Sequence, residues 1–311
     1  MRLGVHVPVA GGLVRAARRA RSLRCECLQI FTRNPRGWRA RPLPEDEIAG
    51  FRALLDRHDI HPLVIHASYL INLASPDRAL REQSLRAMVE DMARGALLGA
   101  RFVVMHPGHH MGAGTAAGLR VLARSLRSLL AGAPDGVDLL LENTAGRGTE
   151  LGGEWEEFAR LLDLLAGDGR VGVCFDTCHA HAAGHRLDSP RWVGRTLNEF
   201  KAALGLDRLC LIHLNDCQGA PGARRDLHAH IGRGTIGDRG LGAVLRRREL
   251  RDLSAILETP MPRPGDDRRN LAQARKLAGR PAPSGPTSRP LARTSPARLS
   301  KAAPRTRTRR R

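Results

Sequence analysis

Short apolar runs recur eight times along the chain, each long enough for one buried strand. They read LGVHV, CLQIF, PLVIH, FVVMH, VDLLLE, VGVCFD, LCLIH and AILE, at 3–7, 27–31, 62–66, 102–106, 137–142, 171–176, 209–213 and 255–258. Helical patterns separate and follow them, at 12–22, 45–58, 77–98, 115–131, 154–166, 190–204, 238–248 and 267–278. Strands that are apolar on both faces and joined by helices form parallel sheets. Eight such units predict an α/β fold, a closed TIM (β/α)8 barrel.

Six of the eight runs end on a histidine or a carboxylate: His66, His106, Glu142, Asp176, His213 and Glu258. In a parallel barrel all strands open at their C-terminal ends onto one face, where active sites form. Taken singly, each residue could be a buried, hydrogen-bonded ring or the cap of the next helix. Together on one rim, ionised carboxylates would repel and desolvate one another unless cations held them. The pattern therefore predicts a metal site at the C-terminal face.

Further ligand-type residues follow the sixth and seventh runs. His179 comes three residues after Asp176, and Asp226 and His228 lie in the loop after 209–213. Nitrogen and oxygen donors of this kind suit zinc. Five histidines and four carboxylates are too many for one tetrahedral ion and enough for two or three. His6 lies inside the first run, and we expect it to support a ligand or face solvent.

Two loops that follow runs on the same face carry arginines and aromatic rings. The first is TRNPRGWR at 32–39, and the second is SYLIN at 68–72. They could be a solvated loop and a small apolar plug over the barrel. They could also form a nucleic-acid surface, with arginines on phosphates and flat or apolar side chains wedged into a disturbed base stack. Their closeness to the predicted metals favours the nucleic-acid surface.

The charge of the chain is strongly basic, at a formal +20. Residues 281–311 hold six prolines and nine basic residues without an acidic one, which predicts a disordered tail after one catalytic domain at 1–280. Without the tail's nine charges, +11 remains. A basic body favours a polyanionic partner. Almost all the basic residues are arginine, however, and a bias in genome base composition would explain that equally well.

The six cysteines and the hydropathy pattern bear on location. The cysteines lie in or beside apolar runs, which is typical of buried reduced thiols, and no CxxC pair occurs. The chain shows no apolar signal segment at its start and no stretch of 18 uncharged apolar residues. We expect a cytoplasmic monomer without membrane contact.

Longer strings make the chain resemble endonuclease IV, the zinc-dependent apurinic/apyrimidinic endonuclease of DNA base excision repair. The matching strings span the barrel and read GVHVPVAGG, FTRNPRGW, HASYLINL, MHPGHH, LENTAGRG, VGVCFDTCHAHAAG, HLND, RDLHAHIGRGTIG and ILETP. HASYLINL and FDTCHAHAAG are the specific ones.

The resemblance implies three zinc ions per chain, with Mn²⁺ as a possible occupant of one site. Their ligands would be His66, His106 and Glu142 for the first ion; Glu142, Asp176, His213 and Glu258 for the second; and His179, Asp226 and His228 for the third. Glu142 would bridge the first two ions. Leu227 departs from the basic residue that usually stands between the last two ligands, but the ligands themselves are retained.

The implied activity is hydrolysis of the phosphodiester bond 5′ to an abasic site in duplex DNA, which leaves a 3′-hydroxyl. Trimming of blocked 3′ ends is expected as well. Glu142 and Glu258 would be catalytic, through bridging of the ions and orientation of the attacking water. Arg36, Tyr69 and Leu70 would contact DNA. DNA binding would place the protein at the nucleoid.

Two other functions remain open from the residues. A barrel sugar isomerase or epimerase also gathers glutamate, aspartate and histidine from strand ends, around one divalent ion. Such an enzyme needs neither His179 with Asp226 and His228 nor the arginine and aromatic loops. A DNA-binding protein with purely structural metals is the second alternative, although structural zinc sites are usually closed four-ligand sites.

Overall fold

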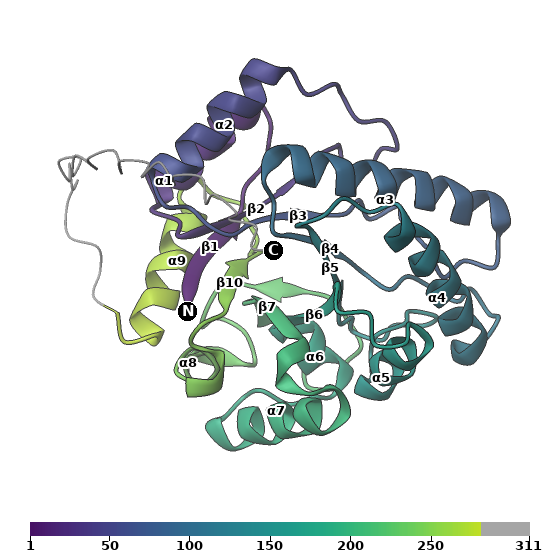
Figure 1. Cartoon of the computed structure of the whole chain (residues 1–311). Helices are drawn as coiled ribbons and strands as arrows, with labels where there is room; N and C mark the ends of the chain where they lie inside the picture. Colours follow the sequence, from purple (N-terminus) through teal and green to yellow (C-terminus); the bar gives the residue numbers. More distant parts are fainter. Residues whose placement is uncertain (281–311) are drawn as a thin grey trace, which may run out of the picture. The chain divides into compact units, whose positions relative to one another are not determined.

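The computed structural model describes residues 1–280 and shows a closed barrel of eight parallel strands. The strands are β1 (Arg2–His6), β2 (Cys27–Phe31), β3 (Leu63–His66), β4 (Phe102–Met105), β5 (Asp138–Glu142), β6 (Val171–Asp176), β7 (Leu209–His213) and β10 (Ser254–Leu257). They close in the order β1-β10-β7-β6-β5-β4-β3-β2 and form the inner ring in Figure 1. The predicted (β/α)8 barrel is therefore confirmed, and the predicted tail lies outside the described residues.

The helices surround this ring, and each predicted helix is present to within three residues. They are α1 (Leu13–Leu23), α2 (Glu45–Arg57), α3 (Arg78–Leu98), α4 (Thr115–Ala131), α5 (Trp155–Leu164), α7 (Pro190–Leu204), α8 (Gly237–Leu245) and α9 (Asp266–Leu277). No helix among residues 1–280 is long and apolar enough to cross a membrane.

A short helix and a short antiparallel strand pair were not predicted. Helix α6 (Thr177–Ala183) follows β6 without a loop, because the Asp176 carboxylate accepts a hydrogen bond from the backbone N–H of His179 at 2.7 Å and caps the helix. An antiparallel pair, β8 (Asp216–Cys217) and β9 (His228–Ala229), lies within the connection from β7 to α8. Both elements belong to the C-terminal face.

An apolar layer fills the barrel below that face. One inward residue from each of seven strands forms it: Cys27, Val64, Val104, Leu140, Cys174, Leu211 and Ile256. In β1 the corresponding residue is Gly4, where a Cβ would lie 2.0 Å from the carbonyl oxygen of Cys27. Since side chains alternate along a strand, the next inward position on each strand is two residues later. This layer is the floor of the candidate site.

The loop at 32–39 is held to the barrel by a buried ion pair. Arg33 and Asp91 are both buried, and Arg33 Nε lies 3.0 Å from Asp91 Oδ1. Arg33 also donates to the carbonyl oxygens of Trp38 and Ala87, and Trp38 packs half-buried against the core. The interpretation of the whole loop as a DNA-facing surface is therefore wrong for Arg33, because its buried side chain anchors the loop, whereas for the half-buried Trp38 it stays a prediction.

We expect Asp91→Ala to lower the free energy of unfolding by about 3–5 kcal/mol, because it leaves the Arg33 guanidinium buried without its ion-pair partner. Glu90→Gln removes the half-exposed acid that lies 3.1 Å from the same guanidinium and should cost less than about 1 kcal/mol. Urea unfolding of both variants tests this, and equal costs would contradict it.

Candidate metal centre

The polar residues of the site form one layer, two positions beyond the floor on each strand. They are His6, Gln29, His66, His106, Glu142, Asp176, His213 and Glu258. The strands thus contribute the six residues predicted from run ends and two others, His6 and Gln29. The pleat of the barrel brings all eight to the same depth, one from each strand.

Glu142 lies at the middle of this layer and has no exposed surface. Its Oε2 is 3.1 Å from His66 Nε2 and 3.2 Å from His106 Nε2, and its Oε1 is 3.0 Å from His213 Nδ1 and 3.2 Å from His179 Nδ1. Burial alone would raise the pKa of Glu142. The nearby histidines, His213 foremost, hold that pKa well below its ordinary value.

The predicted ligands gather into three groups in which one ligand atom per residue lies within 4.8 Å of the others. The groups are His66, His106 and Glu142; Glu142, Asp176, His213 and Glu258; and His179, Asp226 and His228. A fourth combination, of Asp176, Cys178 and His228, overlaps them. The structure therefore brings all nine residues together, and Glu142 belongs to two groups.

Three histidines share an orientation that suits metal ligands. In each, Nδ1 lies 2.7 to 3.0 Å from a backbone carbonyl oxygen, so Nδ1 carries the proton and the lone pair of Nε2 faces the site. The pairs are His66 with Ala67, His179 with Asn143 and His228 with Glu258. His228 Nε2 is buried without a hydrogen bond, 3.2 Å from Asp226 Oδ1. Metal-binding imidazoles are commonly fixed in this way by their other nitrogen.

Two asparagines hold the strand ends that carry the carboxylates, and one of them contacts a carboxylate directly. Asn215 Nδ2 donates to Asp176 Oδ2 at 2.6 Å, and its Oδ1 accepts from the Glu258 backbone N–H at 2.8 Å. Asn143 Oδ1 accepts from the Asp176 backbone N–H at 2.7 Å. Sequence reasoning missed both because amides are not ligands of the expected type. The sequence marks them only by their closeness to predicted ligands, because Asn143 follows Glu142 directly and Asn215 follows His213 by two residues.

The electrostatics of the site pair positive imidazoles with ionised acids. Burial would raise the pKa of Glu258 and Asp226, but His213 holds that of Glu258 well below its ordinary value and His179 lowers that of Asp226 to about 2. Burial would lower the pKa of His179 and His213, yet Asp176 raises that of His179, and Cys174 and Glu142 raise that of His213, both to well above the ordinary value. A divalent cation fits this donor set because it binds the same carboxylates and the neutral imidazoles.

Tyr69, one of the three predicted DNA-contact residues, lies beside this centre. Tyr69 is 63% exposed, with its ring centroid 6.0 Å from that of His66. Arg36 is exposed, and Leu70 is half-buried. Ser68 Oγ donates to the carbonyl oxygen of Pro35 at 2.8 Å and so joins the two loops that carry these side chains. Tyr69 therefore lies at the edge of the site, with Leu70 next to it in sequence and Arg36 on the adjoining loop, and the contact of all three with DNA stays a prediction.

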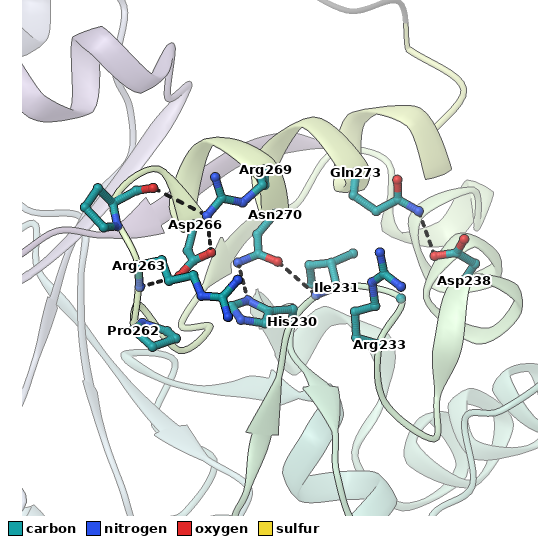
Figure 2. A pocket seen from close by; sticks show the side chains of 12 residues that line it. His230, Ile231, Arg233, Asp238, Pro262, Arg263, Asp266, Arg269, Asn270 and Gln273 are labelled. Atoms are coloured by element: carbon teal, nitrogen blue, oxygen red, sulfur yellow. Dashed lines mark hydrogen bonds and ion pairs between the residues drawn. The ribbon is translucent and has the colours of Figure 1, made fainter.

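A cleft of about 1010 Å³ lies between the segment after β9 and the segment that leads into α9 (Figure 2). Four of its polar side chains bind one another in two pairs. Arg269 Nη2 lies 2.6 Å from Asp266 Oδ1, and Gln273 Nε2 donates to Asp238 Oδ1 at 2.8 Å. Arg233 and Arg263 also line the cleft, both exposed. Within residues 1–280, neither of these two guanidinium groups has an ion-pair partner.

Comparisons with known proteins agree with the fold and identify the family. A family model described as a xylose isomerase-like TIM barrel matches residues 17–278. A probable endonuclease 4 of Methanoculleus marisnigri is 43% identical over 278 residues, which cover 89% of this chain and 99% of the relative.

Solved structures give the same result. The crystal structure of endonuclease IV from Thermus thermophilus matches with a TM-score of 0.80 and 38% identity, and the match covers 90% of this chain and 99% of that one. A D-tagatose 3-epimerase-like protein matches with a TM-score of 0.67 and 21% identity, over 90% and 98% of the two chains, which shows the shared fold alone. The chain therefore belongs to the endonuclease IV family, DNA-cleaving hydrolases built on the xylose isomerase-like TIM barrel.

Proposed function

We propose that this protein hydrolyses the phosphodiester bond on the 5′ side of abasic sites in duplex DNA, leaves a 3′-hydroxyl, and also trims blocked 3′ ends. The observation that carries the proposal is the group of His179, Asp226 and His228 beside the two groups that share Glu142. A sugar isomerase or epimerase with one divalent ion has no need of this third group.

The metal centre would hold three zinc ions, one in each group of ligand atoms, with Mn²⁺ acceptable at one of them. Bound ions would supply positive charge for the phosphate and lower the pKa of a coordinated water. The two oxygens of Glu142 face different histidines, so this carboxylate can bridge two ions. Glu258 would orient the attacking water, because its Oε1 is fixed by Gln29 while its Oε2 lies 3.2 Å from His213 Nδ1.

Selectivity for abasic sites would come from the rim formed by Arg36, Tyr69 and Leu70. An exposed ring and an arginine beside the centre can enter a base stack and bind the backbone. Extrusion of a nucleotide costs least where the base is already missing. We further propose that the protein acts as a monomer in the cytoplasm, associated with the nucleoid through DNA.

The first test is cleavage of a duplex with one abasic analogue. Purified protein should nick the strand on the 5′ side of the analogue, and chelation should abolish the nick. Glu142→Gln should lower kcat by at least about 100-fold, the upper cost of losing a group that only supports a single ligand, because it removes one charge from a ligand shared by two groups. Glu154→Gln, which changes a half-exposed acid in an outer ion pair, is the matched control.

Elemental analysis of the same samples should find more than two ions per chain in the wild-type protein. A single ion would reject the trinuclear centre. Full cleavage by a chelated sample would reject metal-dependent hydrolysis.

The stability of the metal-free protein should depend on pH on both sides of neutrality. Glu142 and Glu258, with pKa values lowered from 4.5, contribute stability above pH 4.5 that is lost as the pH falls. His179 and His213, with pKa values raised from 6.5, contribute stability below pH 6.5 that is lost as the pH rises through their raised values. Urea midpoints in chelator should therefore be highest between these limits.

Saturating zinc should remove the alkaline loss, because the ions then hold the imidazoles in their neutral form. A metal-free midpoint that climbs steadily from about pH 6.5 to about pH 9 would contradict this account of the site.

The cleft lined by Arg233 and Arg263 should add to the affinity for DNA. We expect Arg233→Ala with Arg263→Ala to weaken binding and to lower the salt slope by about 1.8, the value for two lost phosphate contacts, with kcat at saturating DNA unchanged. Arg120→Ala with Arg124→Ala removes the same charge from exposed positions on α4 and is the control. Equal losses from both pairs of substitutions would assign the effect to net charge alone.

A further inference from the structure

Gln29 is the uncharged member of the polar layer and lies in the middle of β2. Its side chain is fully buried at the barrel mouth, above Cys27 of the floor. Three neighbours of the layer contact its amide: Nε2 is 2.6 Å from Glu258 Oε1 and 2.9 Å from His6 Nδ1, and Oε1 is 2.8 Å from His213 Nε2. One amide thus touches two of the proposed metal ligands.

The contact with Glu258 fixes which way the amide faces. A carboxylate only accepts hydrogen bonds, so the amide nitrogen must be the atom at 2.6 Å. The reverse orientation would place two oxygen acceptors against each other at that distance. The amide nitrogen also lies 2.9 Å from His6 Nδ1, which can accept the second N–H when the proton of that ring is on Nε2. The nitrogen of Gln29 therefore faces Glu258, and its oxygen faces His213.

The remaining oxygen of Gln29 decides the tautomer of His213. An amide oxygen has no hydrogen to give, so the contact at 2.8 Å requires a proton on His213 Nε2. A neutral imidazole has one N–H, which leaves the lone pair on Nδ1. That atom lies 3.0 Å from Glu142 Oε1 and 3.2 Å from Glu258 Oε2. The lone pair thus faces the group of ligand atoms that the second ion would occupy.

We propose that Gln29 is a positioning residue of the metal centre, which holds His213 as the Nε2–H tautomer and fixes the carboxylate of Glu258 so that both present ligand atoms to the same divalent ion. This role differs from the support of His66, His179 and His228, whose outer nitrogens are held by backbone carbonyl oxygens. At His213 that task falls to a side chain. The inference rests on the metal centre of the proposed function.

Zinc binding to the intact protein tests the role without any DNA. Gln29→Met keeps the length of the side chain but leaves Glu258 Oε1 and His213 Nε2 without their partner. We expect one of the bound zinc ions to be held about 10–100-fold more weakly in competition with a chelator, the usual cost of losing such a support. Gln29→Glu should bind that zinc ion no more tightly than Gln29→Met does, since it places a second carboxylate against that of Glu258.

Gln83→Met is the matched control, because it makes the same change on the outer helix α3 and should leave zinc binding unaltered. Thermal unfolding of each metal-free variant shows whether it still folds. Wild-type affinity for every zinc ion in Gln29→Met would overturn the proposal.

A measurement on the unsubstituted protein keeps the test independent of folding. Long-range ¹H–¹⁵N NMR of the zinc-loaded protein should show a slowly exchanging proton on Nε2 of His213 and none on Nδ1. A proton on Nδ1 would overturn the proposal. If the zinc-loaded protein showed this Nε2 proton but did not cleave abasic DNA, the result would instead count against the proposed function.

Discussion

The burial of several ionised carboxylates in one place is the constraint on which this structure depends. Glu142 has no exposed surface and Glu258 is largely buried, and both belong to one group of ligand atoms. Desolvation and mutual repulsion would drive such acids to bind protons. The site counters this with positive neighbours, so that the pKa of Glu142 stays well below its ordinary value. The histidines of the layer and Gln29 contact those carboxylates and offset their charge or donate hydrogen bonds to them.

The pleat of the strands turns this requirement into a pattern that can be read from sequence. Residues of the floor and of the polar layer alternate with outward apolar residues such as Ile65, Leu141 and Ile212, which pack against the helices. Six apolar runs end on their inward polar residue, so six ligands could be predicted from type and position alone. The same rule fails in the first two strands, because Val7 follows His6 and Ile30 follows Gln29, and the polar residue falls inside the run.

Long-range partners explain the other failures. Nothing in the loop at 32–39 reveals that Arg33 binds an acid on α3, since Asp91 is 58 residues away in a helix of ordinary appearance. Helix α6 spans only seven residues, too few for a helical period to stand out. The roles of Asn143 and Asn215 also depend on strands that meet only in the closed barrel. The sequence could thus predict the elements and ligands, but not the hydrogen bonds that orient them.

Acids and arginines both lie at the strand ends and loops of the C-terminal face. The four ligand carboxylates lie close together at its centre, whereas Arg36, Arg233 and Arg263 lie exposed in the segments that follow β2, β9 and β10. At a pH above the raised pKa values of His179 and His213, a DNA strand drawn to the arginines would meet repulsion from the four acids at the centre, because the imidazoles are then neutral and carboxylates and phosphates carry the same sign. Bound cations would remove that repulsion before they take part in any reaction. Metal loading would therefore govern how closely the scissile phosphate can approach, and not only how fast it reacts.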